Sequence, residues 1–166
     1  INAYFPKIKV NLLCANNNVN KLIKQCNIYK PKYVHINNDD KYKFLKSNIH
    51  PSIVVLNFSD LKSYLKSSKS DYSLLAISGY NSLKYFKHIL DNTNTLGMVN
   101  KEAIVSAGHI FLKHKKNIMN KIYPLDSEHF SIYKTVTLNS SGNINKLTLT
   151  ASGGPFFGKK FKNLKN

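Results

Sequence analysis

The sequence predicts an α/β fold with a mostly parallel sheet, followed by the start of an α+β segment. Short apolar and β-branched runs alternate along the chain with segments whose apolar residues repeat at helical spacing. Such alternation is typical of βαβ units, in which helices cover a parallel sheet. The run SLLAIS, residues 73–78, is apolar throughout its centre, as expected for a strand covered on both faces. The alternation changes near residue 126, which indicates a second segment.

The first part of the chain contains three predicted strands and three predicted helices. The strands are IKVNLLC, KYVHIN and SIVVLN, residues 8–14, 32–37 and 52–57, and the helices are residues 19–29, 39–47 and 58–67. The clearest helix is 19–29, because Val19, Leu22 and Cys26 repeat at helical spacing and therefore share one face. Pro31 ends it, since proline cannot continue a helix.

The second part follows a predicted linker at residues 68–72. We expect strands at 73–78, 96–99 and 121–125, with helices at about 83–90 and 100–116 between them. SLLAIS is the expected central strand. Beyond residue 126 the pattern predicts a helix at 127–136, a turn at 140–143 and a strand at 146–151.

Composition narrows the class of function. A net charge of +17 first suggests nucleic acid, but all 25 basic residues are lysine and 22 positions are asparagine. This bias is typical of an AT-rich genome, whereas base recognition favours arginine, so we expect no specific nucleic-acid partner. No apolar run approaches a membrane span, and a membrane partner is not expected. Cys14 and Cys26 lack zinc-site spacing and are predicted to be buried thiols.

Ligands in open α/β sheets bind beyond the carboxyl ends of the strands. Four stretches follow predicted strands, and they are residues 15–18, 100–102, 126–129 and 152–154. Asp126 and Glu128 present carboxylates of the kind that Mg²⁺ or Mn²⁺ prefers. On spacing alone, an aspartate cap followed by a first-turn glutamate explains them as well, because both stabilise a helix start.

The other two stretches near the second segment also have two interpretations. Asn100, Lys101 and Glu102 open a helix, where free backbone N–H groups and a lysine can hold an anion, or where an asparagine simply caps the helix. Ser152 with the two following glycines offers a hydroxyl and open amides to a phosphate, or forms a tight turn.

Taken in order, four blocks resemble the 1-deoxy-D-xylulose 5-phosphate reductoisomerase family. The blocks are LLAISGYNSL, GMVNKEAIVSAG, YPLDSEHFSIY and LTASGGPF, preceded by a family-like helix and strand in KLIKQCNIYKPKYV. The resemblance implies a Rossmann-like NADP-binding domain at residues 1–125 and the start of a catalytic domain at 126–166. It covers nearly the whole chain, and the order of the blocks makes it specific.

The resemblance also implies roles for individual residues. Lys101, Asp126 and Glu128 are the implied catalytic residues, with Asp126 and Glu128 as the metal ligands. The implied substrate contacts are Lys101, Ser127, Glu128 and Ser152, and the implied cofactor contacts are Asn16, Asn17, Asn18, Asn100 and Glu102.

The implied reaction is the NADPH-dependent rearrangement and reduction of 1-deoxy-D-xylulose 5-phosphate to 2-C-methyl-D-erythritol 4-phosphate. It implies Mg²⁺ or Mn²⁺, with Co²⁺ as a further candidate, a small phosphorylated sugar as substrate, and a homodimer in the bacterial cytoplasm or the plastid (apicoplast) stroma.

The chain departs from the family pattern in ways that bear on activity. It begins after the family's Gly-rich phosphate loop and ends before a second block that carries an Asn-Lys pair and a further metal-binding glutamate. Asn16 and Asn17 stand where relatives often carry glycine and a basic or small polar residue. We therefore expect an incomplete piece of the enzyme, and the alternative is a degenerate, non-catalytic nucleotide-binding module.

Overall fold

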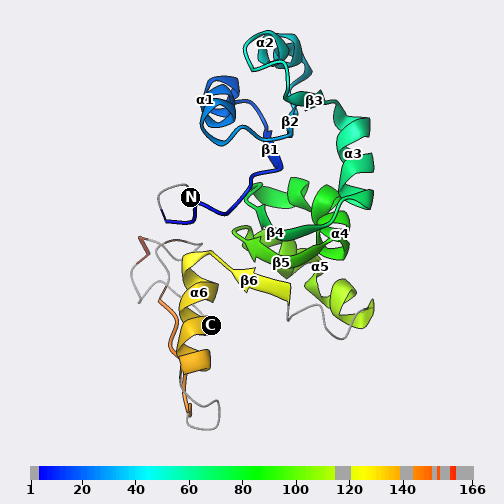
Figure 1. Ribbon diagram of the computed structural model, residues 1–166. Helices are drawn as coiled ribbons and strands as arrows, with labels where there is room; N and C mark the ends of the chain where they lie inside the picture. Colours follow the sequence, from blue (N-terminus) through cyan, green and yellow to red (C-terminus); the bar gives the residue numbers. More distant parts are fainter. Residues whose placement is uncertain (1–3, 115–120, 139–143, 151–152, 154–157, 160–166) are drawn as a thin grey trace. The chain divides into compact units, whose positions relative to one another are not determined.

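The computed structural model describes residues 4–114, 121–138, 144–150, 153, 158 and 159, without the side chains of residues 110–114. The chain divides into two compact units, Ile1–Lys69 and Ser70–Asn166, whose helices and strands are labelled in Figure 1. Each unit holds one three-stranded sheet in which all pairs are parallel. The α/β class with parallel strands is confirmed. The predicted boundary between a cofactor domain and a catalytic domain, between residues 125 and 126, stays a prediction.

The first unit alternates strands and helices as the periodicity predicts. Its elements are β1 (Leu12–Ala15), α1 (Val19–Tyr29), β2 (Tyr33–Ile36), the 3₁₀ turn η1 (Asp39–Lys41), α2 (Tyr42–Ser47), β3 (Val54–Leu56) and α3 (Phe58–Ser67). Asparagine side chains start the two longer helices: Asn18 Oδ1 accepts from the Lys21 N–H at 3.0 Å, and Asn57 Oδ1 accepts from the Asp60 N–H at 2.9 Å. The predicted bounds of α1 and α3 are both confirmed.

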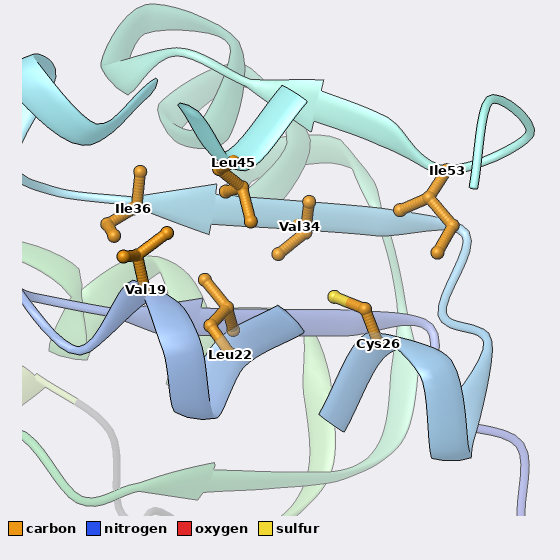
Figure 2. Packing of buried hydrophobic residues seen from close by; sticks show 7 residues of the cluster. All are labelled: Val19, Leu22, Cys26, Val34, Ile36, Leu45 and Ile53. Carbon is orange, nitrogen blue, oxygen red and sulfur yellow. The ribbon is translucent and has the colours of Figure 1, made fainter. Parts of the chain in front are cut away.

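The core of this unit lies between one face of the sheet and the helices α1 and α2. Its buried members are Val19, Leu22, Cys26, Val34, Ile36, Leu45 and Ile53. Figure 2 shows Leu22 and Cys26 of α1 pointing toward Val34 of β2. The prediction of two buried thiols is right for Cys26 and wrong for Cys14, which is exposed. Successive strand residues point to opposite faces, so Cys14 faces away from its neighbours Leu13 and Ala15, which pack against this core.

Truncating Leu22 to alanine is expected to lower the free energy of unfolding by about 2–5 kcal/mol, because this side chain is 1% exposed and its loss leaves a cavity. Ile28→Ala on the same helix is the matched control. Ile28 is 59% exposed, so its truncation should change stability by less than about 0.5 kcal/mol. Urea denaturation measures both variants, and equal losses would contradict this assignment of the core.

The second unit repeats the alternation. Its elements are β4 (Ser70–Leu75), the 3₁₀ turn η2 (Gly79–Ser82), α4 (Leu83–Asp91), β5 (Thr93–Met98), α5 (Lys101–His114), β6 (Ile122–Pro124) and α6 (Ser127–Leu138). Its core contains Leu75, Phe86, Leu90, Leu96, Met98 and Ala103. The register pairs Leu75 with Met98 and Met98 with Pro124, so the three carboxyl ends lie side by side.

Three expectations for this part of the chain are wrong. The predicted linker at 68–72 contains the start of β4, because Ser70 pairs with Thr93 of β5 and the two hydroxyls lie 3.2 Å apart. The central strand of this sheet is β5 rather than β4, and Leu74 of β4 is 69% exposed instead of covered. Residues 146–150, within the predicted last strand, do not form a strand in the structure. A strand needs a neighbouring strand to satisfy its backbone groups, and an apolar pattern alone does not supply one.

None of the helices that the structure describes is both long and apolar enough to cross a membrane.

Candidate functional site

A cavity of about 210 Å³ lies at the carboxyl ends of the strands in the second unit. It is lined by Ala76, Ile77, Ser78, Val99, Asn100, Lys101, Glu102 and Asp126. These residues follow β4, β5 and β6, so each of the three strands contributes to one site. The 100–102 and 126–129 stretches, both expected at strand ends, therefore lie at the same cavity.

The start of α5 forms one wall of the cavity. Asn100 is 4% exposed, and its Oδ1 accepts from the backbone N–H of Ala103 at 3.2 Å, which caps the helix. Lys101 and Glu102 form the first turn and are exposed. The capping interpretation of Asn100 is thus correct, and the first turn still presents a cation and free backbone N–H groups beside the cavity.

The start of α6 brings the other carboxylates to the site. Asp126 Oδ1 accepts from the backbone N–H of His129 at 3.1 Å and lies 2.8 Å from His129 Nδ1. Glu128 follows in the first turn, where its Oε2 accepts from the Ser127 hydroxyl at 2.9 Å. The cluster caps a helix and lies beside a cavity at the same time, so the two interpretations of this stretch are compatible.

One long-range ion pair joins the two helix starts. Lys101 Nζ of α5 lies 4.0 Å from Glu128 Oε1 of α6, and the two side chains are 51% and 27% exposed. A pair this open contributes little to stability. It does show that the charged groups of the lysine and the glutamate, which are far apart in sequence, lie close together in space.

Both carboxylates of α6 are favoured in their ionised forms. Partial burial raises the pKa of Asp126, but the hydrogen bonds from the backbone and ring of His129 outweigh it, and the net pKa is lowered. The pKa of Glu128 is lowered by its own backbone N–H, by the Ser127 hydroxyl and by the charge of Lys101. Ionised carboxylates are the form that binds cations.

A lowered pKa makes the Asp126 contribution to stability pH-dependent. Because the folded-state pKa lies below the unfolded value of about 3.9, this contribution is full above that value and is lost as pH falls through the folded pKa. An NMR titration of the Asp126 carboxyl should show the lowered midpoint. His129→Ala should raise the midpoint only part of the way, since the backbone N–H of residue 129 still donates. An unmoved midpoint would exclude the ring as a cause.

The donor set fits a hard divalent cation. Within the described residues, the hydrogen bonds to Asp126 end on Oδ1, which leaves Oδ2 as a ligand atom. Glu128 adds carboxylate oxygens from the next turn, and Mg²⁺ is commonly held in proteins by one or two carboxylates together with water and substrate oxygens. Across the residues described here, no group of three or more His, Cys, Asp or Glu side chains gathers at one point. Two carboxylates alone would supply only part of the ligand set of such a cation.

The remaining predicted cofactor residues lie in the first unit, between β1 and α1. Asn16 Oδ1 accepts from the side-chain amide of Asn37 at 3.0 Å, and Asn17 Oδ1 accepts from that of Asn38 at 3.1 Å. Asn18 caps α1. These contacts join the loops that follow β1 and β2, so the three asparagines lie at the carboxyl end of this sheet, as predicted.

Ser152 and Gly154 of the predicted phosphate site lie outside the described residues, and Gly153 alone of that stretch is described.

The predictions from sequence missed part of this site. It placed Ala76, Ile77 and Ser78 inside a strand, although they follow β4 and line the cavity. It also assigned no role to His129, the partner of Asp126. The distribution of acidic residues was a further signal for this site. After Asp91 the sequence contains three acidic residues, Glu102, Asp126 and Glu128. In a lysine-rich stretch, every carboxylate belongs to the cavity or to the helix start beside it.

Comparison with known proteins covers almost the whole chain. The family model described as 1-deoxy-D-xylulose 5-phosphate reductoisomerase matches residues 1–108, and the model of the C-terminal domain of that enzyme matches residues 122–166. The reductoisomerase of Pelagibacter ubique is 36% identical over 162 residues, and that of Ruminiclostridium cellulolyticum is 35% identical over 161 residues. The alignments cover 94% and 96% of this chain but 42% of each relative.

Solved structures of reductoisomerases are similar in fold. A Zymomonas mobilis reductoisomerase in complex with NADPH superposes with a TM-score of 0.71 at 26% identity, covering 81% of this chain and 36% of the other. A DOX-P reductoisomerase in complex with NADPH, fosmidomycin and magnesium superposes with a TM-score of 0.75 at 25% identity, covering 98% and 43%. The chain thus spans less than half the length of the proteins that it matches.

Proposed function

We propose that this chain, which belongs to the 1-deoxy-D-xylulose 5-phosphate reductoisomerase family, supplies the cofactor-binding and part of the metal-binding portion of that enzyme. The reaction is the rearrangement and NADPH-dependent reduction of 1-deoxy-D-xylulose 5-phosphate to 2-C-methyl-D-erythritol 4-phosphate. The observation that carries the proposal is the cavity at three parallel strand ends, where Lys101, Glu102 and Asp126 meet.

Asp126 and Glu128 are the proposed ligands of a divalent cation, Mg²⁺ or Mn²⁺ and also Co²⁺. Their lowered pKa values support this assignment, because both groups are ionised without a metal. When bound, such a cation polarises substrate oxygens as a Lewis acid. His129 holds Asp126 in one orientation through two contacts to the same oxygen, Oδ1, which leaves Oδ2 as the proposed ligand atom.

Lys101, Ser127 and Glu128 are the proposed substrate contacts. Lys101 Nζ carries three donors, and its exposed position beside Glu128 lets it donate to a hydroxyl or anionic oxygen of the sugar. The Ser127 hydroxyl orients Glu128 Oε2 and can also bind a substrate oxygen. These residues hold the reacting carbon skeleton in place, which is the main task of a protein in a reaction of this kind.

Residues in each of the two units are proposed as cofactor contacts. Asn100 and Glu102 line the cavity and are proposed to contact the nicotinamide end. Asn16, Asn17 and Asn18 precede α1, and the positive end of the helix dipole there favours the phosphates at the adenosine end. NADPH supplies the hydride, and the residues around it orient the ring.

Ser152 is proposed to bind the substrate phosphate, on the sequence pattern alone. Ser152→Ala in the full-length gene product should raise the KM for the sugar phosphate by about 10- to 100-fold, because one hydrogen bond to a charged group is worth roughly 1.5–3 kcal/mol. The KM for NADPH should change much less. Ser140→Ala is a matched control, since it removes a serine hydroxyl from the predicted turn at 140–143. Equal increases in both KM values would count against the phosphate role.

The proposal extends to the assembly and location of the whole enzyme. We propose a homodimer in the bacterial cytoplasm or plastid stroma, with residues 1–125 in the cofactor domain and 126–166 opening the catalytic domain. Light scattering of the full-length product tests the dimer.

The function itself is tested by following the loss of NADPH absorbance by the full-length gene product with 1-deoxy-D-xylulose 5-phosphate and Mn²⁺. Substrate-dependent oxidation that stops on chelation supports the proposal. NADPH binding without oxidation would instead identify a non-catalytic nucleotide-binding protein.

A further inference from the structure

The buried side chain of Asn100 connects two segments that line the cavity. Its amide nitrogen donates to the carbonyl of Ile77, to the carbonyl of Gly79 at 2.8 Å and to the Ser82 hydroxyl at 3.1 Å. Its Oδ1 accepts from the N–H of Ala103 at 3.2 Å. One side chain therefore joins the segment after β4 to the first turn of α5.

The hydrogen-bonding capacity of the Asn100 amide nitrogen is fully used. An amide NH₂ has two protons, and three acceptors already share them. The residue is 4% exposed, so a ligand in the cavity would have to break these bonds to reach the nitrogen. Direct recognition of a cofactor by this NH₂ group would take the donor from the partly buried carbonyl of Ile77 and weaken the contact with Ser82, which is unfavourable.

Ser82 completes the arrangement on the other side. It is fully buried, and its hydroxyl donates to the Gly79 carbonyl at 3.0 Å while it accepts from Asn100. Gly79 has a φ of 67°, a conformation that glycine adopts easily, and this lets the chain turn after β4 toward Asn100. The turn, Ser82 and Asn100 form one connected polar network beneath the cavity wall.

We propose that Asn100 is a positioning residue, which fixes Ile77 and Ser78 relative to Lys101 and Glu102 on the opposite wall. This inference rests on the proposed function, and it changes the role expected of Asn100 from a side-chain contact with the cofactor to a support of the groups that make such contacts. The width of the cavity, and with it the orientation of the bound nicotinamide ring, depends on this amide.

The test compares Asn100→Asp and Asn100→Ala in the full-length gene product. Asp keeps the shape and the acceptor for Ala103, but at neutral pH it places a carboxylate against two carbonyls. Both variants should lower kcat by about 100-fold, the effect of misplacing reacting groups by about 1 Å. The dissociation constant for NADPH, measured by fluorescence, should change less than about threefold, because the contacts proposed for the adenosine end, Asn16, Asn17 and Asn18, are not altered.

A pH profile separates positioning from a general loss of structure. Burial raises the pKa of a carboxyl group, so aspartate at position 100 should gain a proton, and with it a donor, as pH falls from about 8 to 6. The kcat of Asn100→Asp relative to the wild type should then recover, while that of Asn100→Ala should not. Ser82→Ala should be non-additive with Asn100→Ala, since both remove the same network. Asn94→Ala, at an exposed position in the same unit, is the control and should leave kcat unchanged.

Two results would overturn the inference. A rise in the NADPH dissociation constant as large as the fall in kcat would show direct contact, and an unchanged kcat in both Asn100 variants would show no role. If the wild type does not turn over, the proposed function fails. Hydrogen exchange then decides the inference alone: faster exchange in Asn100→Ala at residues 76–82 and 101–104 supports the connection, and unchanged exchange there excludes it.

Discussion

Asp126→Asn in the full-length gene product is expected to abolish turnover while leaving NADPH binding nearly intact. The substitution removes the negative charge that a divalent cation needs, and the loss of a charged ligand costs several kcal/mol, on the order of 10³-fold or more in rate. The fold should survive, because asparagine is as good a helix cap as aspartate and can still accept from the His129 N–H. The variant therefore tests the charge rather than the structure.

Turnover is measured as substrate-dependent NADPH oxidation with Mg²⁺ or Mn²⁺, and binding by NADPH fluorescence. Asp91→Asn is the matched control, because this substitution removes the same charge from the same unit. Asp91 pairs with Lys87 on α4 and does not line the cavity. It should retain wild-type activity. Unchanged metal-dependent activity in Asp126→Asn would exclude Asp126 as a ligand.

The helices were predictable from sequence because local signals define them. Val19, Leu22 and Cys26 mark the buried face of α1, and the asparagines at 18 and 57 mark where α1 and α3 begin. The strand limits were less predictable. Ser70 and Thr93 open β4 and β5 with polar residues, and only their pairing across the sheet makes them strand residues. Such pairing between distant segments leaves no local pattern in the sequence.

Some residues that line the cavity were predictable from sequence, but the geometry of the cavity was not. Strand ends led to Lys101 and Asp126, and the parallel order of β4, β5 and β6 brings them to one cavity. The network around Asn100 was not predictable, because Ser82 becomes its partner only when η2 folds back on α5. The position of Asn100 before a helical pattern identifies it as a cap of α5. Its other hydrogen bonds, to the segment after β4, are visible only in the structure.

The electrostatics of the site depend in the same way on tertiary contacts. The pKa of Glu128 is lowered in part by Lys101, a residue on another helix. The pKa of Asp126, by contrast, is lowered by His129, which lies three positions further along the chain, in the first turn of α6. That pair is local and could have been predicted from the sequence.

The chain of 166 residues, tested alone, is expected to show no reductoisomerase activity. Its described residues offer Asp126 and Glu128 as metal ligands, and no larger group of potential ligands gathers among them. The alignments cover 42% of the length of the two curated relatives, so more than half of each relative has no counterpart among these 166 residues. An incomplete ligand set and the lack of any contact made by the unmatched part of the relatives should each remove several kcal/mol of organisation, by order of magnitude.

These two deficits should compound, because catalysis needs cofactor, metal and substrate to be held together. We expect weak NADPH binding at best, and no loss of NADPH absorbance when 1-deoxy-D-xylulose 5-phosphate and Mn²⁺ are added to the purified chain. The full-length gene product in the same assay is the positive control. If it oxidises NADPH and the 166-residue chain does not, the missing activity belongs to the remaining sequence rather than to the assay. Clear turnover by the 166-residue chain would show that its own residues complete the metal and phosphate sites, and the assignment of Asp126 and Glu128 as a partial ligand set would then be wrong.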